Sequence, residues 1–98
     1  EDEGEIFIGC AGGVDTLATF RYKTEAAPEG HVFVRVRVSD LSGGHSGDDI
    51  DKGRMNSIKL VARLLWNGAQ RFGLSLSRFD GGNLRNAIPR EAYAVFAV

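Results

Sequence analysis

Two short polar segments carry the side chains best suited to chemistry. The first is residues 41–51, LSGGHSGDDID, in which three glycines surround one histidine. The imidazole of His45 can donate or accept a hydrogen bond, or transfer a proton, near neutral pH. Gly43, Gly44 and Gly47 would let the backbone of this loop approach another group closely. The loop therefore has two interpretations: a plain surface turn, or a segment that presents His45 to a ligand.

The second segment is residues 81–91, GGNLRNAIPRE, which places Arg85 and Asn86 between a glycine turn and a proline. Arginine supplies a charged, forked donor and asparagine supplies an amide N–H, so the two together could hold a carboxylate. A polar loop explains the same residues, because asparagine and glycine are common in turns. Both interpretations stay open on these residues alone.

Other site chemistries fit the sequence poorly. The glycine loop lacks the Gly-Lys-Ser/Thr of a phosphate-binding P-loop. Ser46 lies in Gly-His-Ser-Gly, but Asp48 follows where a nucleophile elbow has glycine, and no base is identifiable. One cysteine and two histidines are too few for a structural zinc site, which usually has about four ligands. We expect Cys10 to be a small buried residue and His31 to be structural.

The composition places limits on the class of protein. The 98 residues suggest one domain, and 43% hydrophobic with 26% charged residues is ordinary for a soluble protein. A net charge of -1 gives no basic surplus for nucleic acid, and no apolar run approaches the roughly 20 residues that span a membrane. The single cysteine is typical of a reducing compartment. We expect a cytoplasmic protein that binds neither nucleic acid nor membrane, and the apolar end AYAVFAV suggests a piece of a longer chain.

The spacing of apolar residues predicts the elements that must position the two polar segments. Helical spacing of Ile58, Val61 and Leu65 predicts a helix over 51–66 that begins with the acids of the loop, includes Met55 and ends at Asn67-Gly68, with Trp66 covering its end. Alternation predicts the strands, which cover 5–8, 16–24, 31–40, 72–79 and about 89–98.

This order of elements predicts an α+β fold, with a mostly antiparallel sheet and one helix on one face. Residues 31–98 supply β-α-β-β, which is the first part of a ferredoxin-like unit, and extra strands precede it. In the strand 31–40 the valines point to one face, whereas Arg35 and Arg37 point to the other.

Three segments together resemble the cytosolic aminoacyl-histidine (X-His) dipeptidases of the M20 metallopeptidase family: EGEIFIGCAGG, LSGGHSGDDIDKGRMNSIKLVARLL and FDGGNLRNAIPREAYAVFAV. In that family a catalytic domain holds two zinc ions, and an inserted ferredoxin-like lid commonly mediates dimerisation. The resemblance implies that residues 1–13 lead out of the catalytic domain as a strand and glycine turn. Residues 14–98 would then form the N-terminal part of the lid.

The resemblance also assigns roles to single residues. His45 matches a lid histidine that donates a hydrogen bond to the scissile carbonyl oxygen, often in the active site of the partner subunit. Asn86 matches a lid asparagine that helps to hold the terminal carboxylate of the substrate, with Arg85 beside it. The glycines of the loop would allow its close approach. The zinc ligands and the catalytic glutamate of the family have no counterpart in this chain, and Asp48, Asp49 and Asp51 are helix-start acids instead.

The resemblance therefore implies the lid of a zinc-dependent dipeptidase that forms a homodimer and takes dipeptide substrates. Both zinc ions would be bound by the catalytic domain, so the chain alone should hydrolyse nothing. The alternative is a non-catalytic ferredoxin-like module for dimerisation or for interaction with a partner.

Overall fold

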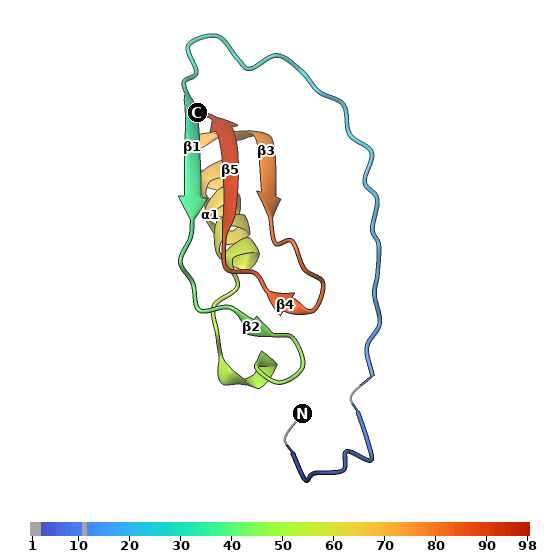
Figure 1. Cartoon of the computed structure of the whole chain (residues 1–98). Helices are drawn as coiled ribbons and strands as arrows, with labels where there is room; N and C mark the ends of the chain where they lie inside the picture. The colour runs from blue at the N-terminus through green and yellow to red at the C-terminus, as the bar shows by residue number, and fades with distance from the viewer. Residues whose placement is uncertain (1–2, 11) are drawn as a thin grey trace.

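The computed structural model describes residues 3–10 and 12–98. Its core is a three-stranded sheet with one long helix on one face, whereas a two-stranded ribbon and a short 3-10 helix lie beyond one end of the sheet (Figure 1). In chain order the elements are β1 (Phe33–Val38), β2 (Gly44–His45), η1 (Ile50–Lys52), α1 (Ser57–Phe72), β3 (Ser75–Gly81), β4 (Ala87–Ile88) and β5 (Ala92–Ala97).

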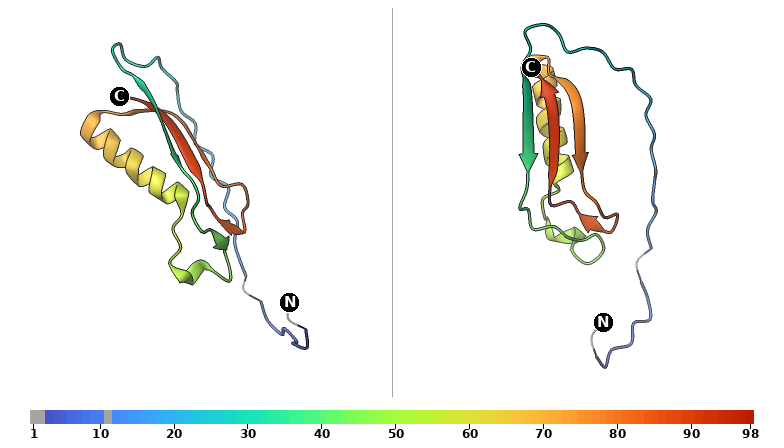
Figure 2. Two further views of the ribbon diagram at one scale, coloured as in Figure 1. Left: turned by 60° about the vertical axis from the view of Figure 1, so that its left-hand side comes forward. Right: turned by 45° about the horizontal axis from the view of Figure 1, so that its top comes forward.

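The sheet has the strand order β1-β5-β3, and β5 is antiparallel to both neighbours. β1 and β3 therefore run parallel to each other, with α1 as the crossover between them and β5 inserted in the middle. This is the split β-α-β arrangement of a ferredoxin-like unit. The predicted α+β fold, with a mostly antiparallel sheet and one helix on one face, is confirmed (Figure 2).

The core forms where α1 packs on the middle strand. Val61 and Leu65 of the helix meet Ala92, Ala94 and Phe96 of β5, and all five side chains are buried. Two alanines on the inner face of β5 let the helix approach the sheet closely. Partly buried side chains extend this core: Val36, Val38, Ile58, Leu74 and Phe79.

The outer face of the sheet is polar, as the alternation in β1 predicted. Arg35 and Arg37 of β1 are paired in register with Val95 and Tyr93 of β5. The guanidinium carbon of Arg35 lies 4.8 Å from the centre of the Tyr93 ring, on the face away from α1. The helix covers only one side of the sheet, and the other side is left open (Figure 2).

The predicted start of the helix is wrong by six residues. The helix begins at Ser57, not at residue 51, because the side chain of Asn56 accepts the backbone N–H of Lys59 at 3.1 Å and caps it. Gly53 adopts a left-handed φ of 65° and ends η1, so the two helices cannot merge. Asp48 and Asp49 therefore lie in the loop and Asp51 lies in η1, whereas Met55 lies between η1 and α1.

The predicted end of the helix is wrong as well. Asn67 and Gly68 lie inside α1, which continues to Phe72 and ends at Gly73, where φ is 64°. A Cβ at position 68 would meet the Leu74 side chain at 2.9 Å, so this glycine serves close packing and does not stop the helix. Trp66 is 68% exposed and does not cover the helix end.

The strands predicted over 5–8 and 16–24 are absent from the described residues, and their side chains are exposed. Alternation marks a segment that suits a sheet, but a strand also needs a neighbour for its backbone hydrogen bonds. In Figure 1 this segment passes outside the sheet on the β3 side. Cys10 is exposed here, not buried. Residues 1, 2 and 11 of the predicted 1–13 unit lie outside the described residues.

Candidate functional site

The structure brings the two polar segments together in the β2–β4 ribbon. His45 is opposite Ala87 and Gly44 is opposite Ile88, in antiparallel register. One step further, the backbone N–H of Ser46 donates to the carbonyl oxygen of Asn86 at 3.0 Å. Backbone pairing therefore places His45 beside Asn86, although 40 residues of chain and the whole helix separate them.

The imidazole of His45 is held from one side only. Its Nδ1 accepts the backbone N–H of Gly47 at 3.0 Å and that of Asp48 at 3.3 Å. The side chain is 53% exposed, and all the polar contacts of the ring with other described residues are at Nδ1, so Nε2 is left without a partner among them. A Cβ at Gly47 would lie 3.1 Å from Nδ1, which leaves little room for a larger residue under the ring. The loop thus fixes one edge of the imidazole and presents the other.

Asp49 organises the loop from within. Its Oδ2 accepts the backbone N–H of His45 at 2.8 Å, and its Oδ1 accepts from Lys52 Nζ at 2.7 Å and lies 3.2 Å from Arg54 Nη2. The hydrogen bond from Lys52, followed by that from the His45 backbone, holds the pKa of Asp49 below its ordinary value. The carboxylate is 17% exposed, which is low for an acid on a loop.

Arg54 connects this carboxylate to the strand before the histidine. Its Nη1 donates to the carbonyl oxygen of Gly43 at 2.8 Å while Nη2 faces Asp49. No sequence motif marks Arg54, and Asp49 was predicted only as an acid at the start of a helix. The one signal that could have found them is the opposite charge of Asp49 and Arg54 within a loop that is otherwise rich in glycine.

The loop glycines are demanded by close packing and by backbone conformation. Gly44 has a φ of +146°, and a Cβ there would meet Arg54 Nη1 at 2.6 Å and Asp49 Oδ2 at 2.7 Å. Gly43 is buried with a φ of +66°, and a Cβ there would collide with the side chain of Arg90. Neither position has space for a side chain, so packing within the loop itself requires glycine at both.

Arg85 and Asn86 directly precede β4 of the ribbon, and both are exposed. Arg85 Nη1 lies 3.0 Å from Asp15 Oδ2, with side chains that are 82% and 73% exposed. A pair so exposed adds little to stability, but it shows that this guanidinium can meet a carboxylate. Asn86 contributes its backbone oxygen to the ribbon, and its side chain is left to solvent.

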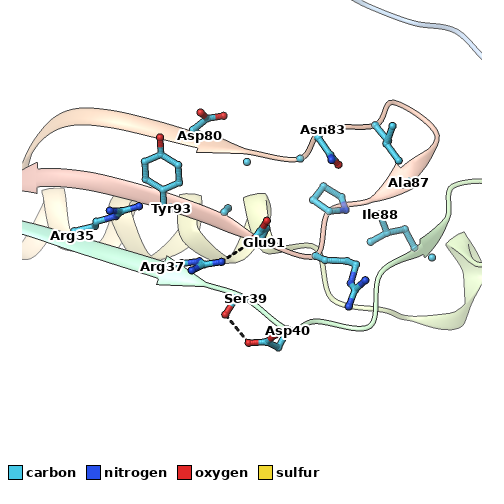
Figure 3. Close-up of a pocket in the computed structure, with 17 residues that line it drawn as sticks. Arg35, Arg37, Ser39, Asp40, Asp80, Asn83, Ala87, Ile88, Glu91 and Tyr93 are labelled. Atoms are coloured by element: carbon cyan, nitrogen blue, oxygen red, sulfur yellow. Dashed lines mark hydrogen bonds and ion pairs between the residues drawn. The ribbon is translucent and has the colours of Figure 1, made fainter.

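An open groove of about 1030 Å³ runs from the outer face of the sheet to the ribbon. Figure 3 shows Arg35, Arg37 and Tyr93 along one part of it and Asn83 and Ala87 toward the ribbon. Arg37 forms a 2.7 Å ion pair with Glu91 across the groove floor. The groove ends at Gly44, one residue before His45, so a molecule lying in it would reach the loop.

The described residues contain neither a metal-binding group of side chains nor a helix that could span a membrane. Among residues 3–10 and 12–98, no three His, Cys, Asp or Glu side chains are grouped so as to bind a metal ion. Asp49, the least exposed acid beside His45, is instead engaged with the backbone N–H of His45 and with Lys52 and Arg54. The helices in this part of the chain include none long and apolar enough to cross a membrane.

Comparison with known proteins agrees with this architecture. The chain is 47% identical over all its 98 residues to the cytosol non-specific dipeptidase of Escherichia coli (strain K12), and it spans 20% of that protein's length. It matches the crystal structure of aminoacylhistidine dipeptidase from Vibrio alginolyticus with a TM-score of 0.72 and 47% identity, over 76% of this chain and 15% of that one. The family model of the M20 peptidase dimerisation domain matches residues 29–98. With more than half of its length matched, the chain belongs to the M20 peptidase dimerisation domain family.

Proposed function

We propose that this chain is the first part of the lid of a dipeptidase, in which residues 1–13 lead out of a catalytic domain and residues 14–98 belong to the lid. Both relatives that it matches at 47% identity are named as dipeptidases, and the chain spans a fifth or less of each. The observation that carries the proposal is the β2–β4 ribbon, which holds His45 beside Asn86 at an exposed tip. A substrate-contacting loop of a lid needs such a tip.

His45 is the group that meets the reacting part of the substrate. Its exposed ring edge donates a hydrogen bond to the scissile carbonyl oxygen, where negative charge develops in the transition state. A donor that is already held in position needs no reorganisation free energy when the transition state forms. The hydrogen bonds at Nδ1 hold the ring in this way. Asn86 and Arg85 hold the terminal carboxylate of the substrate from the neighbouring strand.

The metal chemistry of such an enzyme lies outside these residues. The described part of the chain gathers no metal-binding group, so it does not fit a zinc site of its own. Two zinc ions would be held by a catalytic domain, and this chain would supply hydrogen bonds to the substrate only. On this proposal, the 98 residues alone should hydrolyse no dipeptide.

The same assignment includes a homodimer in the cytoplasm. The matching family model is that of a dimerisation domain, and one relative is named as a cytosol enzyme. The dimer partners are two copies of the longer protein, each closing its lid over substrate. In this arrangement His45 reaches the active site of the second subunit.

A comparison of two substrates tests the proposal. The longer protein that contains this chain, supplied with zinc, should hydrolyse an X-His dipeptide and should be much slower on the same dipeptide with an amidated C-terminus. Arg85→Ala should reduce the preference for the free carboxylate, whereas Arg71→Ala, an exposed arginine on α1, should leave it unchanged. A protein that is inert toward a panel of dipeptides would contradict the proposal and favour a non-catalytic dimerisation module.

A further inference from the structure

The hydrogen bonds at His45 determine which ring nitrogen carries the proton. Backbone N–H groups can only donate, and two of them, from Gly47 and Asp48, point at Nδ1 at 3.0 and 3.3 Å. A ring nitrogen that accepts a hydrogen bond has no proton of its own. In the neutral imidazole the proton must then be on Nε2, at the exposed edge of the ring.

The nearest carboxylate does not compete for this position. Asp48 Oδ2 lies 3.9 Å from Nδ1, which is beyond hydrogen-bond distance, and the Asp48 side chain is 89% exposed. A proton on Nδ1 would turn toward Asp48 only by breaking both backbone hydrogen bonds. Of the other charged side chains nearby, Asp49 is paired with Lys52 and Arg54, and Asp51 is exposed in η1.

The turn that aims these two N–H groups depends on Asp49 and Arg54. The carboxylate of Asp49 accepts the N–H of His45, and the N–H of Asp49 donates to the His45 carbonyl oxygen at 3.0 Å, which closes the turn around residues 45–49. Arg54 ties the same carboxylate to the carbonyl oxygen of Gly43. The backbone on both sides of His45 is thereby fixed to one side-chain pair.

We propose that Asp49 and Arg54 are positioning residues that hold His45 as the neutral tautomer with its proton on Nε2. The exposed Nε2–H is then the donor that faces a substrate oxygen. The substrate role of this donor rests on the proposed function, whereas the tautomer itself does not. Neither residue touches the substrate, so each acts only through His45.

The tautomer can be measured without substrate. In the 98-residue chain labelled with 15N-histidine, long-range proton–nitrogen correlation should show Nδ1 of His45 as the unprotonated nitrogen and Nε2 as the protonated one. His31→Gln assigns the signals, since the chain has two histidines. Asp49→Ala should give a mixture of tautomers. Asp49→Asn keeps an oxygen that can accept the His45 N–H, so this variant should keep His45 mostly as the tautomer protonated on Nε2.

A matched control separates positioning from general disturbance. Asp51 lies in η1 and is exposed, and its side chain has no hydrogen bond or ion pair with other described residues. Asp51→Ala should leave the tautomer unchanged. Retained amide signals of β1 and β5 in every variant show that the sheet is intact. A wild-type His45 protonated on Nδ1, or an Asp49→Ala variant with an unaltered tautomer, overturns the inference.

Kinetics in the longer protein complete the test. Asp49→Ala should lower kcat by about 10²-fold, as expected for a misplaced catalytic group, with KM little changed, and Asp49→Asn should recover part of the loss. An Asp49→Ala enzyme with wild-type kcat contradicts the positioning role. If His45→Ala leaves turnover unchanged while the tautomer is as stated, the proposed function fails and the tautomer assignment stands.

Discussion

The carboxylate of Asp49 accepts the backbone N–H of His45 at 2.8 Å, and the backbone N–H of Asp49 donates to the carbonyl oxygen of His45 at 3.0 Å. This reciprocal pair converts a glycine-rich segment into a defined turn. Within this turn, the backbone N–H groups of Gly47 and Asp48 point at Nδ1 of the imidazole. An acid that the sequence suggests for a helix start thus shapes the loop that carries the histidine.

Substitution of Gly44 by alanine should disrupt this turn. The new Cβ would lie 2.6 Å from Arg54 Nη1 and 2.7 Å from Asp49 Oδ2, and the φ of +146° already disfavours a side chain. We expect lower thermal stability and a lower kcat in the longer protein. Gly53→Ala is the control, because φ there is +65° but no atom lies within 4 Å. It should cost about 1–2 kcal/mol of stability through backbone strain alone, with kcat retained.

The ionisation of Asp49 should make stability depend on pH. Its pKa in the folded chain lies below the ordinary 3.8, because Lys52 and the His45 backbone favour the charged form. The stabilisation is therefore fully present above about pH 3.8 and is lost as the pH falls through the folded pKa. Urea unfolding between about pH 6 and pH 2 should show a steeper loss for the wild type than for Asp49→Asn. Equal slopes for the two proteins would contradict this coupling.

The cap at Asn56 should matter more than an ordinary surface contact. Its side chain accepts the N–H of Lys59 and sets the start of α1, which keeps η1 and residues 53–55 outside the helix. Asn56→Ala should reduce the free energy of unfolding by about 1 kcal/mol. Gln70→Ala, at an exposed position of the same helix, should cause no loss, since alanine favours helix. Similar values for both variants in urea denaturation would rule out the capping role.

The parts of the fold that follow a period could be predicted from sequence. The alternation in β1 and the helical spacing of Val61 and Leu65 place these residues on the core side, where the structure has them. The predicted helix boundaries were wrong at both ends. The acids before residue 52 suggested a start earlier than the true cap at Asn56, and Asn67-Gly68 suggested an end earlier than the true cap at Gly73. A helix cap depends on one local hydrogen bond, and the spacing of apolar residues gives no information about that bond.

The site could be predicted only in its outline. His45 and Asn86 stand out by type, but a ladder of two residues per strand has no period that would reveal their pairing. The contacts of Asp49 and Arg54 depend on the conformation of Gly44, which the sequence does not specify. Residues 5–8 and 16–24 show the reverse case, since they alternate as strands do but have no paired neighbour among the described residues.

The role of His45 as a donor to substrate is best measured by comparing the two histidines in the longer protein. With zinc and an X-His dipeptide, His45→Ala should lower kcat by about 10²–10³-fold, as for the loss of one donor to a developing oxyanion. His31→Ala should leave kcat unchanged, because His31 lies just before β1, at the far end of the sheet from the ribbon (Figure 1). Unfolding of both variants at wild-type urea concentrations would show that the fold is intact. A His45→Ala enzyme with wild-type kcat would contradict the account.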